Sequence, residues 1–441
     1  IPQRVGPDSH WETPKIQTSN PAQTHMKIFW YTLTPRFRAF AVFIGAFFLT
    51  QVGFGATGLA LDTLDLLFGV YIAAFVVYFL ARWGFFARRV PINLPNQTEV
   101  IYEKLRQNPG KRRTAPGEPV EFIDPEEADD ELLDDDRVIG VFYNGEAAAY
   151  PLAALGVREV SNEEYGDTPI SVTWSPVTYS ARGFIAKANN EILNFGRHTH
   201  TVFNSPALPE KSGSDFIQFT GQGITGPLTG SQVKQIPVTT TTWIAWKEAH
   251  PDTEVMSTEG GPELDIFERY YANDRNGIHS LNPIDKRLHG KDVVIGLDMK
   301  GSVKAYSYRA LIDKPLIEEY FGREPILVLH ERASSAAVVF SRLVNGQTLN
   351  FKGKNKNPHR RSAEVTASGE GERIEYEAWL IEDEQTGSIW RAISGECVEG
   401  EHKGKYLEML PGMTSFWFAW SRFYPESELF GADFDGLSTE N

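Results

Sequence analysis

The chain of 441 residues has a single cysteine, Cys397, and a shortage of basic residues. One cysteine excludes an internal disulfide and a metal site built from cysteines alone. Lysine and arginine number 43 against 58 aspartate and glutamate residues, which gives a formal net charge of −15. A general nucleic-acid-binding protein needs a basic face to contact phosphates, so we expect no nucleic-acid partner.

The sequence also lacks the short motifs that identify common enzymes. It contains no Gly-Lys-Ser/Thr phosphate loop and no Gly-x-Ser-x-Gly nucleophile elbow. His198 and His200 stand two residues apart, and such a pair on a strand could share a metal ion. We find no acidic or cysteine partner near them in the sequence. We therefore expect surface or hydrogen-bonding roles for both, and no cofactor bound by a dedicated motif.

What the sequence does contain is an internal repeat. Residues 138–150 recur as residues 294–306, at an offset of 156 residues. After an insertion the register resumes at an offset of 174, with the pairs Gly221/Gly395, Trp243/Trp417 and Trp246/Trp420. This pattern indicates a tandem duplication. A residue present in both halves is then architectural, and a residue present in one half only is the better candidate for function.

Strand and turn signals fill both halves of the repeat. Asn144-Gly145 and Asn345-Gly346 are typical hairpin turns between apolar strands, and the Trp-x-x-Trp segments have helical spacing. We predict a β-rich α+β fold with short helices. Its two similar lobes are expected to form a pseudo-two-fold pair that shares one core.

Two long apolar runs, residues 39–61 and 66–86, precede the repeat. Each exceeds or matches the roughly 20 helical residues that cross a hydrocarbon layer of about 30 Å. We predict a two-helix transmembrane hairpin, and hence a multi-pass protein of the bacterial inner membrane. Basic residues flank the hairpin and Asp62 and Asp65 lie in its loop, which places both lobes in the cytoplasm. A periplasmic location is the alternative.

Small and aromatic residues mark the expected contact surfaces of this hairpin. Small residues at four-residue spacing allow close packing, either between its two helices or with other membrane-protein subunits. Neither span contains a histidine, so we expect the hairpin to ligate no haem or chlorophyll metal, although pigments or lipids could contact its surface. The residues expected to pack against the bilayer or partner subunits are Ala41, Gly45, Gly69, Ala73, Trp30 and Trp83.

These features divide the chain into seven segments. They are an extended polar tail (1–25), an interfacial segment with the hairpin (26–89), a linker (90–122), a first repeat lobe (123–257), an inter-repeat connection (258–291), a second repeat lobe (292–430) and a tail (431–441).

The repeat motifs resemble an uncharacterised bacterial and archaeal domain family of unknown function. The resemblance covers about residues 118–430 and rests on Asn-Gly-Glu-Ala-x-Ala-Tyr-Pro-Leu, Thr-Gly-Pro-Leu-Thr-Gly and Thr-Thr-Trp-x-x-Trp. Members typically carry Cys-Pro-x-Cys-Gly after the strand that follows the first of these motifs, and such a pair suits a soft metal or a redox role. Ser175, Pro176 and Thr178 stand there in this chain. The resemblance therefore implies a retained fold and lost thiol chemistry.

Together these observations predict a non-catalytic, membrane-anchored accessory subunit that stabilises a multi-subunit membrane complex. A bacterial photosynthetic reaction-centre and light-harvesting assembly is the first choice, because a histidine-free hairpin suits a subunit that ligates no pigment. Its partners would be other membrane-protein subunits and the lipid bilayer. Two alternatives stay open: a metal-binding or redox protein of the parent family, and a free-standing membrane-anchored binding protein.

Metal analysis of the purified chain separates the non-catalytic interpretation from the metalloprotein one. We expect no stoichiometric copper, iron or zinc, because the sequence offers no partner for the two histidines. A stoichiometric metal that disappears when His198→Ala and His200→Ala are combined would contradict the non-catalytic interpretation.

Overall fold

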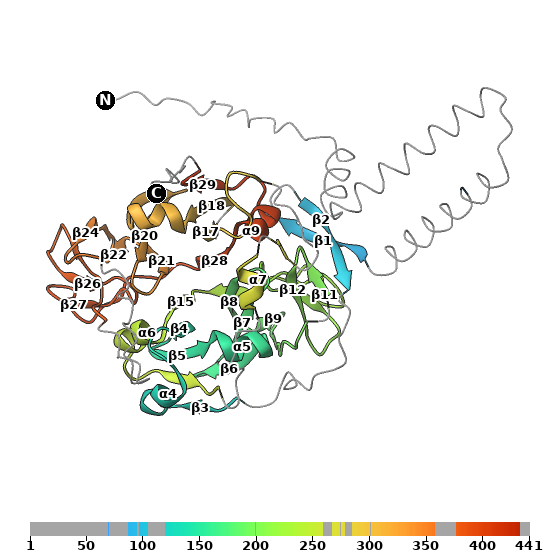
Figure 1. Ribbon diagram of the computed structural model, residues 1–441, viewed down its shortest axis with the longest axis horizontal. Helices are drawn as coiled ribbons and strands as arrows, with labels where there is room; N and C mark the ends of the chain where they lie inside the picture. Colours follow the sequence, from blue (N-terminus) through green and yellow to red (C-terminus); the bar gives the residue numbers. More distant parts are fainter. Residues whose placement is uncertain are drawn as a thin grey trace, which may run out of the picture. The chain divides into compact units, whose positions relative to one another are not determined.

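The computed structural model describes residues 69, 87–94, 97–104, 120–198, 200–258, 267–273, 275–277, 285–299, 301–357 and 376–432 (Figure 1). Residues 87–104 are described by their backbone alone. The chain divides into two compact units, Ile1–Ile72 and Ala73–Asn441. Apart from Gly69, everything described below belongs to the second unit.

The first half of the repeat, together with residues 87–104 before it, forms three main sheets and a small hairpin. Strand order in the central sheet is β15 (Thr239–Thr242), β4 (Arg137–Tyr143), β5 (Glu146–Pro151), β16 (Glu254–Met256) and β3 (Phe122–Ile123). A second sheet has the order β14 (Lys234–Ile236), β8 (Ser180–Ile185), β7 (Thr168–Ser175) and β6 (Val160–Tyr165). The third contains β1 (Ala87–Leu94), β2 (Gln97–Lys104), β11 (His200–Val202), β12 (Ser205–Pro209) and β13 (Asp215–Ile217), and the hairpin pairs β9 (Lys187–Ala188) with β10 (Glu191–Ile192).

The second half repeats the first two of these sheets. Its central sheet has the order β28 (Met413–Phe416), β17 (Val293–Met299), β18 (Ser302–Ser307) and β29 (Glu428–Phe430). Beside it lie β19 (Leu316–Phe321), β20 (Glu324–Glu331) and β21 (Ala336–Ser341), and a hairpin of β22 (Leu343–Val344) and β23 (Gln347–Thr348). The last sheet contains β24 (Phe351–Gly353), β25 (Leu380–Asp383), β26 (Ile389–Arg391) and β27 (Cys397–Glu399).

The described helices are short and follow strands or turns directly. They are α4 (Pro125–Glu131), α5 (Leu152–Arg158), α6 (Trp243–Ala249), α7 (Glu268–Tyr271), α8 (Tyr308–Asp313) and α9 (Trp417–Phe423). Helix α4 shows how the sequence starts one of them: the Asp124 carboxylate accepts a hydrogen bond from the Glu127 backbone N–H, and a proline occupies the first helical position.

Equivalent positions of the two halves have equivalent places and backbone conformations. Strands β4 and β17 each pair antiparallel with the next strand, and β5 and β18 each take a short parallel partner, β16 and β29. The turn glycines Gly145 and Gly301 have φ values of 88° and 83°. Gly221 and Gly395 have φ values of 74° and 69°. Only glycine adopts such values without strain, which explains why these positions keep glycine in both halves.

A tryptophan ring lies against a strand glycine in each half. A Cβ atom added to Gly140 would come within 2.1 Å of the Trp246 ring, and one added to Gly296 within 2.1 Å of the Trp420 ring. The indole nitrogen of each tryptophan donates a 2.9 Å hydrogen bond to a hydroxyl, on Thr253 and Ser427 respectively. Each ring thereby fixes helix α6 or α9 over its central sheet.

The two halves share an aromatic core. Val202, Phe203, Ile217 and Phe219 of the first half pack in one buried cluster with residues of α9. The Phe219 and Phe423 rings stack with centroids 4.3 Å apart and planes 10° apart. Stacked aromatic pairs contribute about 0.5–1.5 kcal/mol beyond the apolar area that they bury. This cluster joins the halves into one packed body.

The predicted transmembrane hairpin requires a correction. Among the residues that the structure describes, no helix is long and apolar enough to span a membrane. The longest described helices have seven residues, which at 1.5 Å per residue is about 10 Å against the roughly 30 Å of a hydrocarbon core. Residues 39–61 and 66–86 lie outside the described part of the chain, except for Gly69. The β-rich part of the predicted fold class fits, and the hairpin and the multi-pass location derived from it are withdrawn.

The glycine–tryptophan contact predicts a measurable loss of stability. Gly140→Ala should lower the free energy of unfolding by about 1–3 kcal/mol, because the added methyl group overpacks the Trp246 contact. Gly156→Ala is the matched control: its Cβ would meet its nearest neighbour, Pro176, at an ordinary 3.6 Å, and alanine favours helix α5. Urea unfolding measures both. Equal stability of Gly140→Ala and wild type would show that the ring does not press on this glycine.

Candidate functional site

The family motif lies in the turn between β7 and β8, and its two variant positions are in contact. The Thr178 hydroxyl donates a 2.8 Å hydrogen bond to Ser175 Oγ, and both side chains are buried. Thr178 Oγ1 also lies 2.8 Å from Ser180 Oγ, which donates to Gln218 Oε1 at 2.9 Å. These hydroxyl groups therefore satisfy one another inside the protein, and the turn holds a buried polar network.

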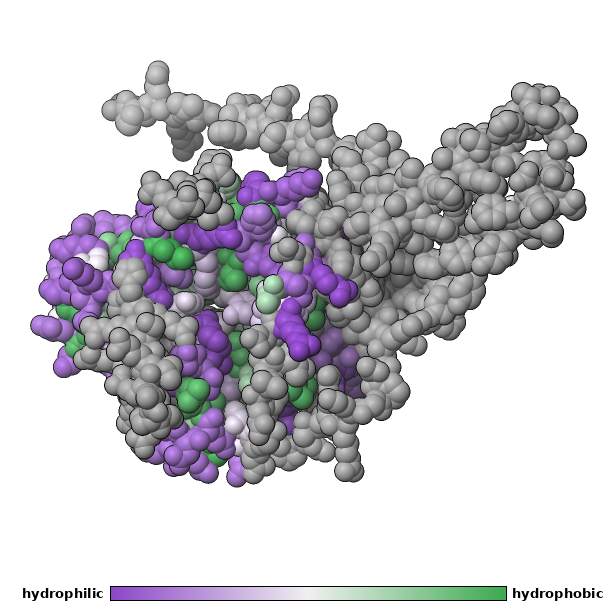
Figure 2. Space-filling view, viewed as in Figure 1, coloured by the Kyte–Doolittle hydropathy of each residue, from purple (hydrophilic) through white to green (hydrophobic). Residues whose placement is uncertain are grey.

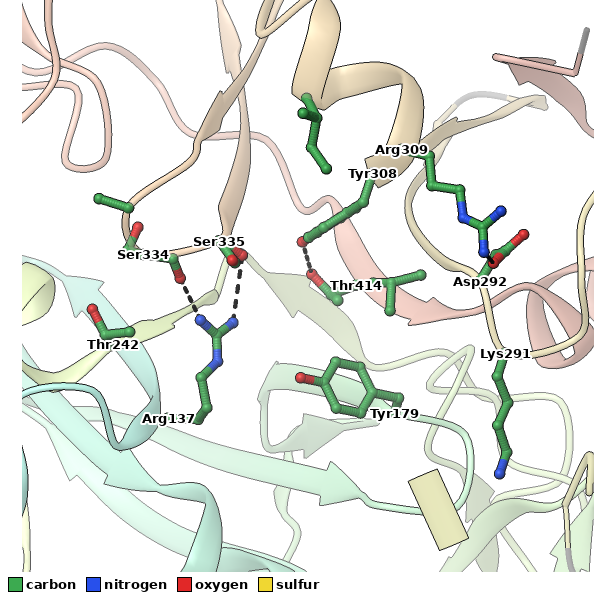
Figure 3. Close-up of a pocket in the computed structure, with 13 residues that line it drawn as sticks. Arg137, Tyr179, Thr242, Lys291, Asp292, Tyr308, Arg309, Ser334, Ser335 and Thr414 are labelled. Carbon is green, nitrogen blue, oxygen red and sulfur yellow. Dashed lines mark hydrogen bonds and ion pairs between the residues drawn. The ribbon is translucent and has the colours of Figure 1, made fainter. Parts of the chain in front are cut away.

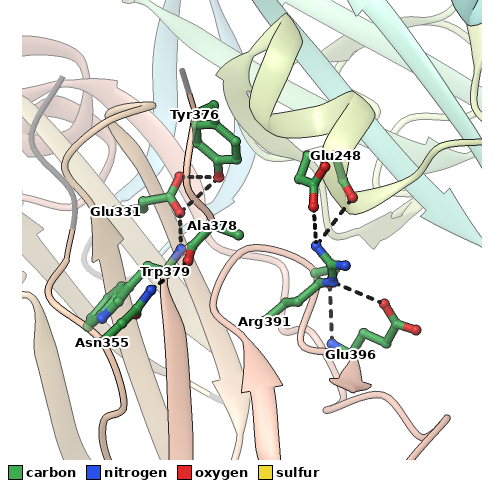
Figure 4. Close-up of polar contacts among 9 residues, drawn as sticks. Glu248, Glu331, Asn355, Tyr376, Ala378, Trp379, Arg391 and Glu396 are labelled. Atoms are coloured by element: carbon green, nitrogen blue, oxygen red, sulfur yellow. Dashed lines mark hydrogen bonds and ion pairs between the residues drawn. The ribbon is translucent and has the colours of Figure 1, made fainter. Parts of the chain in front are cut away.

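The equivalent turn of the second half, between β20 and β21, is held by Glu331. This carboxylate accepts hydrogen bonds from Tyr376 Oη at 2.8 Å and 2.9 Å and from the Trp379 backbone N–H at 3.0 Å (Figure 4). It also accepts a hydrogen bond from Ser334 Oγ at 2.6 Å. Burial raises the pKa of the Glu331 carboxyl group. Four bonds on one buried carboxylate fix the turn against the strand that follows Tyr376.

A cleft of ≈ 450 Å³ lies where these two turns meet (Figure 3). Small-molecule sites in proteins commonly measure about 300–1,000 Å³, so the cleft has a suitable size for a ligand. Its described lining comes from both halves and consists of Arg137, Tyr179, Thr242, Lys291, Asp292, Val293, Tyr308, Arg309, Ile312, Ala333, Ser334, Ser335 and Thr414.

Equivalent but different residues of the two halves face this cleft. Val293 stands 156 residues after Arg137, and Ser335 stands 156 residues after Tyr179. All four line the cleft. Because the repeat retains the backbone positions and changes the side chains, Arg137 and Tyr179 meet the criterion for functional rather than architectural residues.

Arg137 joins the two halves across the cleft. It lies opposite Thr242 in the β4–β15 ladder, and its Nη1 donates a hydrogen bond to the Ser334 carbonyl oxygen. Its Nη2 donates to the Thr240 carbonyl oxygen at 3.3 Å and lies 3.5 Å from that of Ser335. Its Nε is buried without a hydrogen-bond partner. The guanidinium group thus meets carbonyl dipoles and keeps its full positive charge.

Tyr179 occupies a position whose backbone favours glycine. Its φ is 52°, a left-handed conformation that tyrosine rarely adopts, and the resemblance places a glycine here. Its ring stacks on Phe416 at 5.0 Å and meets the edges of Trp174 and Tyr271 at 5.0 Å and 5.6 Å. These aromatic contacts offset the backbone strain and hold the ring in the wall of the cleft.

Tyr308 lies in the opposite wall, and His330 packs against it. The Tyr308 hydroxyl lies 2.9 Å from Thr414 Oγ1, and burial raises its pKa to about 12. The His330 ring packs edge-on against Tyr308 at 5.1 Å, and its Nδ1 is buried without a partner. Burial, with a smaller effect of the Arg332 and Arg137 charges, lowers the pKa of His330 to about 4. Both rings are therefore neutral at pH 7.

The predicted histidine pair lies elsewhere. His198 Nδ1 pairs with Glu159 Oε2, an acidic partner that the sequence analysis did not find because 39 residues separate the two. His200 begins β11, and neither histidine lines the cleft. Among the described residues no group of three metal-ligating side chains is present.

The structure describes only some of the other predicted site residues. Ser175, Pro176 and Thr178 belong to the motif turn beside the cleft. Trp30, Ala41, Gly45, Ala73 and Trp83 lie outside the described residues, and Gly69 has no neighbour within 4 Å of its Cβ position. Arg137 was not among the residues predicted from the sequence. Its replacement by Val293 at the equivalent position of the repeat could have identified it.

The fold and the cleft define a β-rich protein with two corresponding halves and a ligand-sized cleft between their turns. Residues 118–427 match the family described as "Protein of unknown function (DUF3179)", so the chain belongs to that family. The prediction of an unknown-function domain family is confirmed. No curated protein and no solved structure gives a match.

The buried His330 predicts a pH effect on stability. Its pKa is about 4 in the folded protein and about 6.5 in the unfolded chain, so its contribution is present above pH 6.5 and is lost as the pH falls from 6.5 through 4. His330→Phe keeps a ring against Tyr308 and removes this titration. As the pH falls over this range, the free energy of unfolding of the variant should fall less steeply than that of wild type. The two slopes should differ by at most about 1.4 kcal/mol per pH unit. Equal slopes for variant and wild type in urea unfolding would contradict the buried, neutral histidine.

Proposed function

We propose that the described part of the chain is a non-catalytic binding module whose cleft between the two halves holds a small molecule. One observation carries the proposal: a cleft of ≈ 450 Å³ is lined by side chains from both halves of the repeat. At two equivalent positions the halves supply different residues, Arg137 and Val293, Tyr179 and Ser335. A duplicated frame with different side chains from each half suits a ligand that contacts both halves at once.

The chemistry of the cleft supports binding rather than catalysis. Its described lining contains hydroxyl groups, guanidinium groups, one ammonium group and one carboxylate, and that carboxylate, Asp292 Oδ1, lies 3.0 Å from Arg309 Nη2. A nucleophile needs a base within hydrogen-bond reach, and the Thr414 hydroxyl has Tyr308 as its partner instead. The Ser334 hydroxyl donates to the Glu331 carboxylate, and both side chains are buried in the hydrogen-bonded turn. A tyrosine whose pKa is raised to about 12 is a poor base.

An accessory role in a larger assembly stays a prediction of the sequence. The exposed large apolar residues are dispersed over β-strands, turns and helices, for example Leu133, Ile192, Tyr320 and Tyr406. In the face shown in Figure 2, apolar side chains are interspersed with hydrophilic ones. Neither the described residues nor the comparisons link the chain to a photosynthetic assembly, and that expectation is withdrawn. Affinity purification of the tagged full chain, followed by mass spectrometry, tests whether it has stable protein partners.

Thermal unfolding of the full chain with a library of small molecules tests the binding module. A ligand present at roughly 100 times its Kd should raise the free energy of unfolding by about 2.7 kcal/mol. Ala333→Phe places a ring in the cleft and should abolish this stabilisation. Ala153→Phe, on the exposed side of α5, is the matched control and should retain it.

Two results would overturn the proposal. Ligands that stabilise the Ala333→Phe variant as much as wild type would bind outside the cleft. If no compound of the library stabilised the wild-type protein, the cleft would have no binding role. Mass spectrometry of the bound compound checks the non-catalytic part, because a chemically changed ligand would reveal turnover.

A further inference from the structure

The cleft has a positive charge on a strongly acidic protein. Arg137, Lys291 and Arg309 line it, and Asp292 is the one carboxylate of its described lining. The Lys291 ammonium group donates to the Tyr270 and Asn273 carbonyl oxygens, so Arg137, Arg309 and Asp292 leave a formal charge of about +1 at the cleft. The whole chain has a formal net charge of −15. Local charge of the opposite sign in a concave site concentrates counter-ions of that site, so this cleft attracts anions.

The two guanidinium groups are separated rather than convergent. In Figure 3, Arg137 lies beside Ser334 and Ser335, and Arg309 lies beside Asp292 on the other side of Tyr308 and Thr414. A phosphate concentrates its charge at one point and is usually held by donors that converge on it. The two separated guanidinium groups instead match a ligand that carries two acid groups some distance apart.

Each guanidinium group retains the capacity to bind an anion. The hydrogen bonds of Arg137 go to carbonyl oxygens, which satisfy donors without neutralising the charge. The Arg309 side chain is 49% exposed and shares one carboxylate contact at 3.0 Å. A guanidinium group has five N–H donors, so this contact leaves most of them for a ligand.

Apolar side chains lie between the charged ends. Val293, Ile312 and Ala333 line the cleft together with the Tyr179 and Tyr308 rings. A chain of methylene groups can pack on such a surface and is stabilised by the apolar area that it buries. The lining therefore combines two cationic ends with an apolar middle.

We propose that the ligand of this cleft is a small aliphatic dicarboxylate, with one carboxylate at Arg137, the other at Arg309 and the methylene chain against Tyr308 and Ile312. This inference rests on the proposed binding function and names the ligand class. At Arg309, where the contact with Asp292 uses Nη2, a carboxylate can accept hydrogen bonds from the remaining guanidinium N–H groups. At Arg137, whose Nη groups donate to carbonyl oxygens, the unneutralised positive charge attracts the other carboxylate.

Isothermal titration calorimetry on the full chain tests the ligand class. The probes are succinate, glutarate and adipate, the diamide and the monoamide of each, and an alkyl phosphate monoester. We expect one dicarboxylate to bind best, its monoamide to bind less tightly, and its diamide to bind at least about tenfold more weakly than the diacid. Affinity should fall as the salt concentration rises, because salt screens the charges.

Substitutions locate the two acid groups. Arg309→Gln removes a half-exposed charge, and should weaken dicarboxylate binding about tenfold while monoamide binding changes little. Arg323→Gln, in an exposed turn outside the cleft, is the matched control and should leave affinity unchanged. Arg137→Gln removes the positive charge at the other end of the cleft and should weaken binding of the diacid about tenfold.

The outcomes separate this inference from the proposed function. A neutral compound or a diamide that binds as tightly as the diacid, and is blocked by Ala333→Phe, overturns the dicarboxylate and leaves the binding module standing. Tighter binding of the phosphate monoester overturns the assignment of two separated carboxylates. Dicarboxylate binding that is unaffected by Ala333→Phe overturns the location in this cleft.

Discussion

The close packing of a tryptophan ring against a strand glycine is the constraint on which the rest of the structure depends. Trp246 can approach Gly140 only because that glycine has no Cβ, and the contact fixes helix α6 over strand β4. Strand β15 leads directly into this helix and pairs Thr242 with Arg137. The same contact in the second half fixes α9 and pairs Phe416 with Val293. Arg137, Thr242 and Val293 line the cleft, and Phe416 stacks on Tyr179 in its wall, so a core contact determines where the cleft side chains stand.

The cleft gains its asymmetry from side chains rather than from backbone. At equivalent positions the halves keep similar backbone angles, as at Tyr179 and Ser335 with φ values of 52° and 49°. The side chains differ in size and charge, which provides one wall with an aromatic ring and the other with small hydroxyl groups. A backbone hydrogen bond from Phe416 N–H to the Thr178 carbonyl oxygen, 2.9 Å long, holds the two halves in register beside the cleft. Duplication thus supplies a rigid frame, and divergence supplies specificity.

The motif turn shows how a family position can change its chemistry and keep its structure. Ser175 and Thr178 are in hydrogen-bond contact at the place where the resemblance predicts two cysteines. Buried hydroxyl groups need partners, and Ser180 and Gln218 provide them. The second half solves the same problem with Glu331, whose carboxylate accepts four hydrogen bonds. In both turns hydrogen bonds within the protein occupy the polar atoms, and the adjacent cleft is left for a ligand.

Local sequence patterns were sufficient to predict the hairpin turns, the Trp-x-x-Trp helices and the β-rich lobes. Asn-Gly pairs and apolar spacing act over only a few residues. Sequence comparison between the halves was sufficient to separate architectural glycines from variable positions. The apolar runs near the N-terminus led to a membrane assignment that the described helices do not support. Only the tertiary structure brought Arg137 to Ser334, 197 residues away, and Glu159 to His198. Contacts of such sequence separation follow from the packing of whole sheets, which no local pattern encodes.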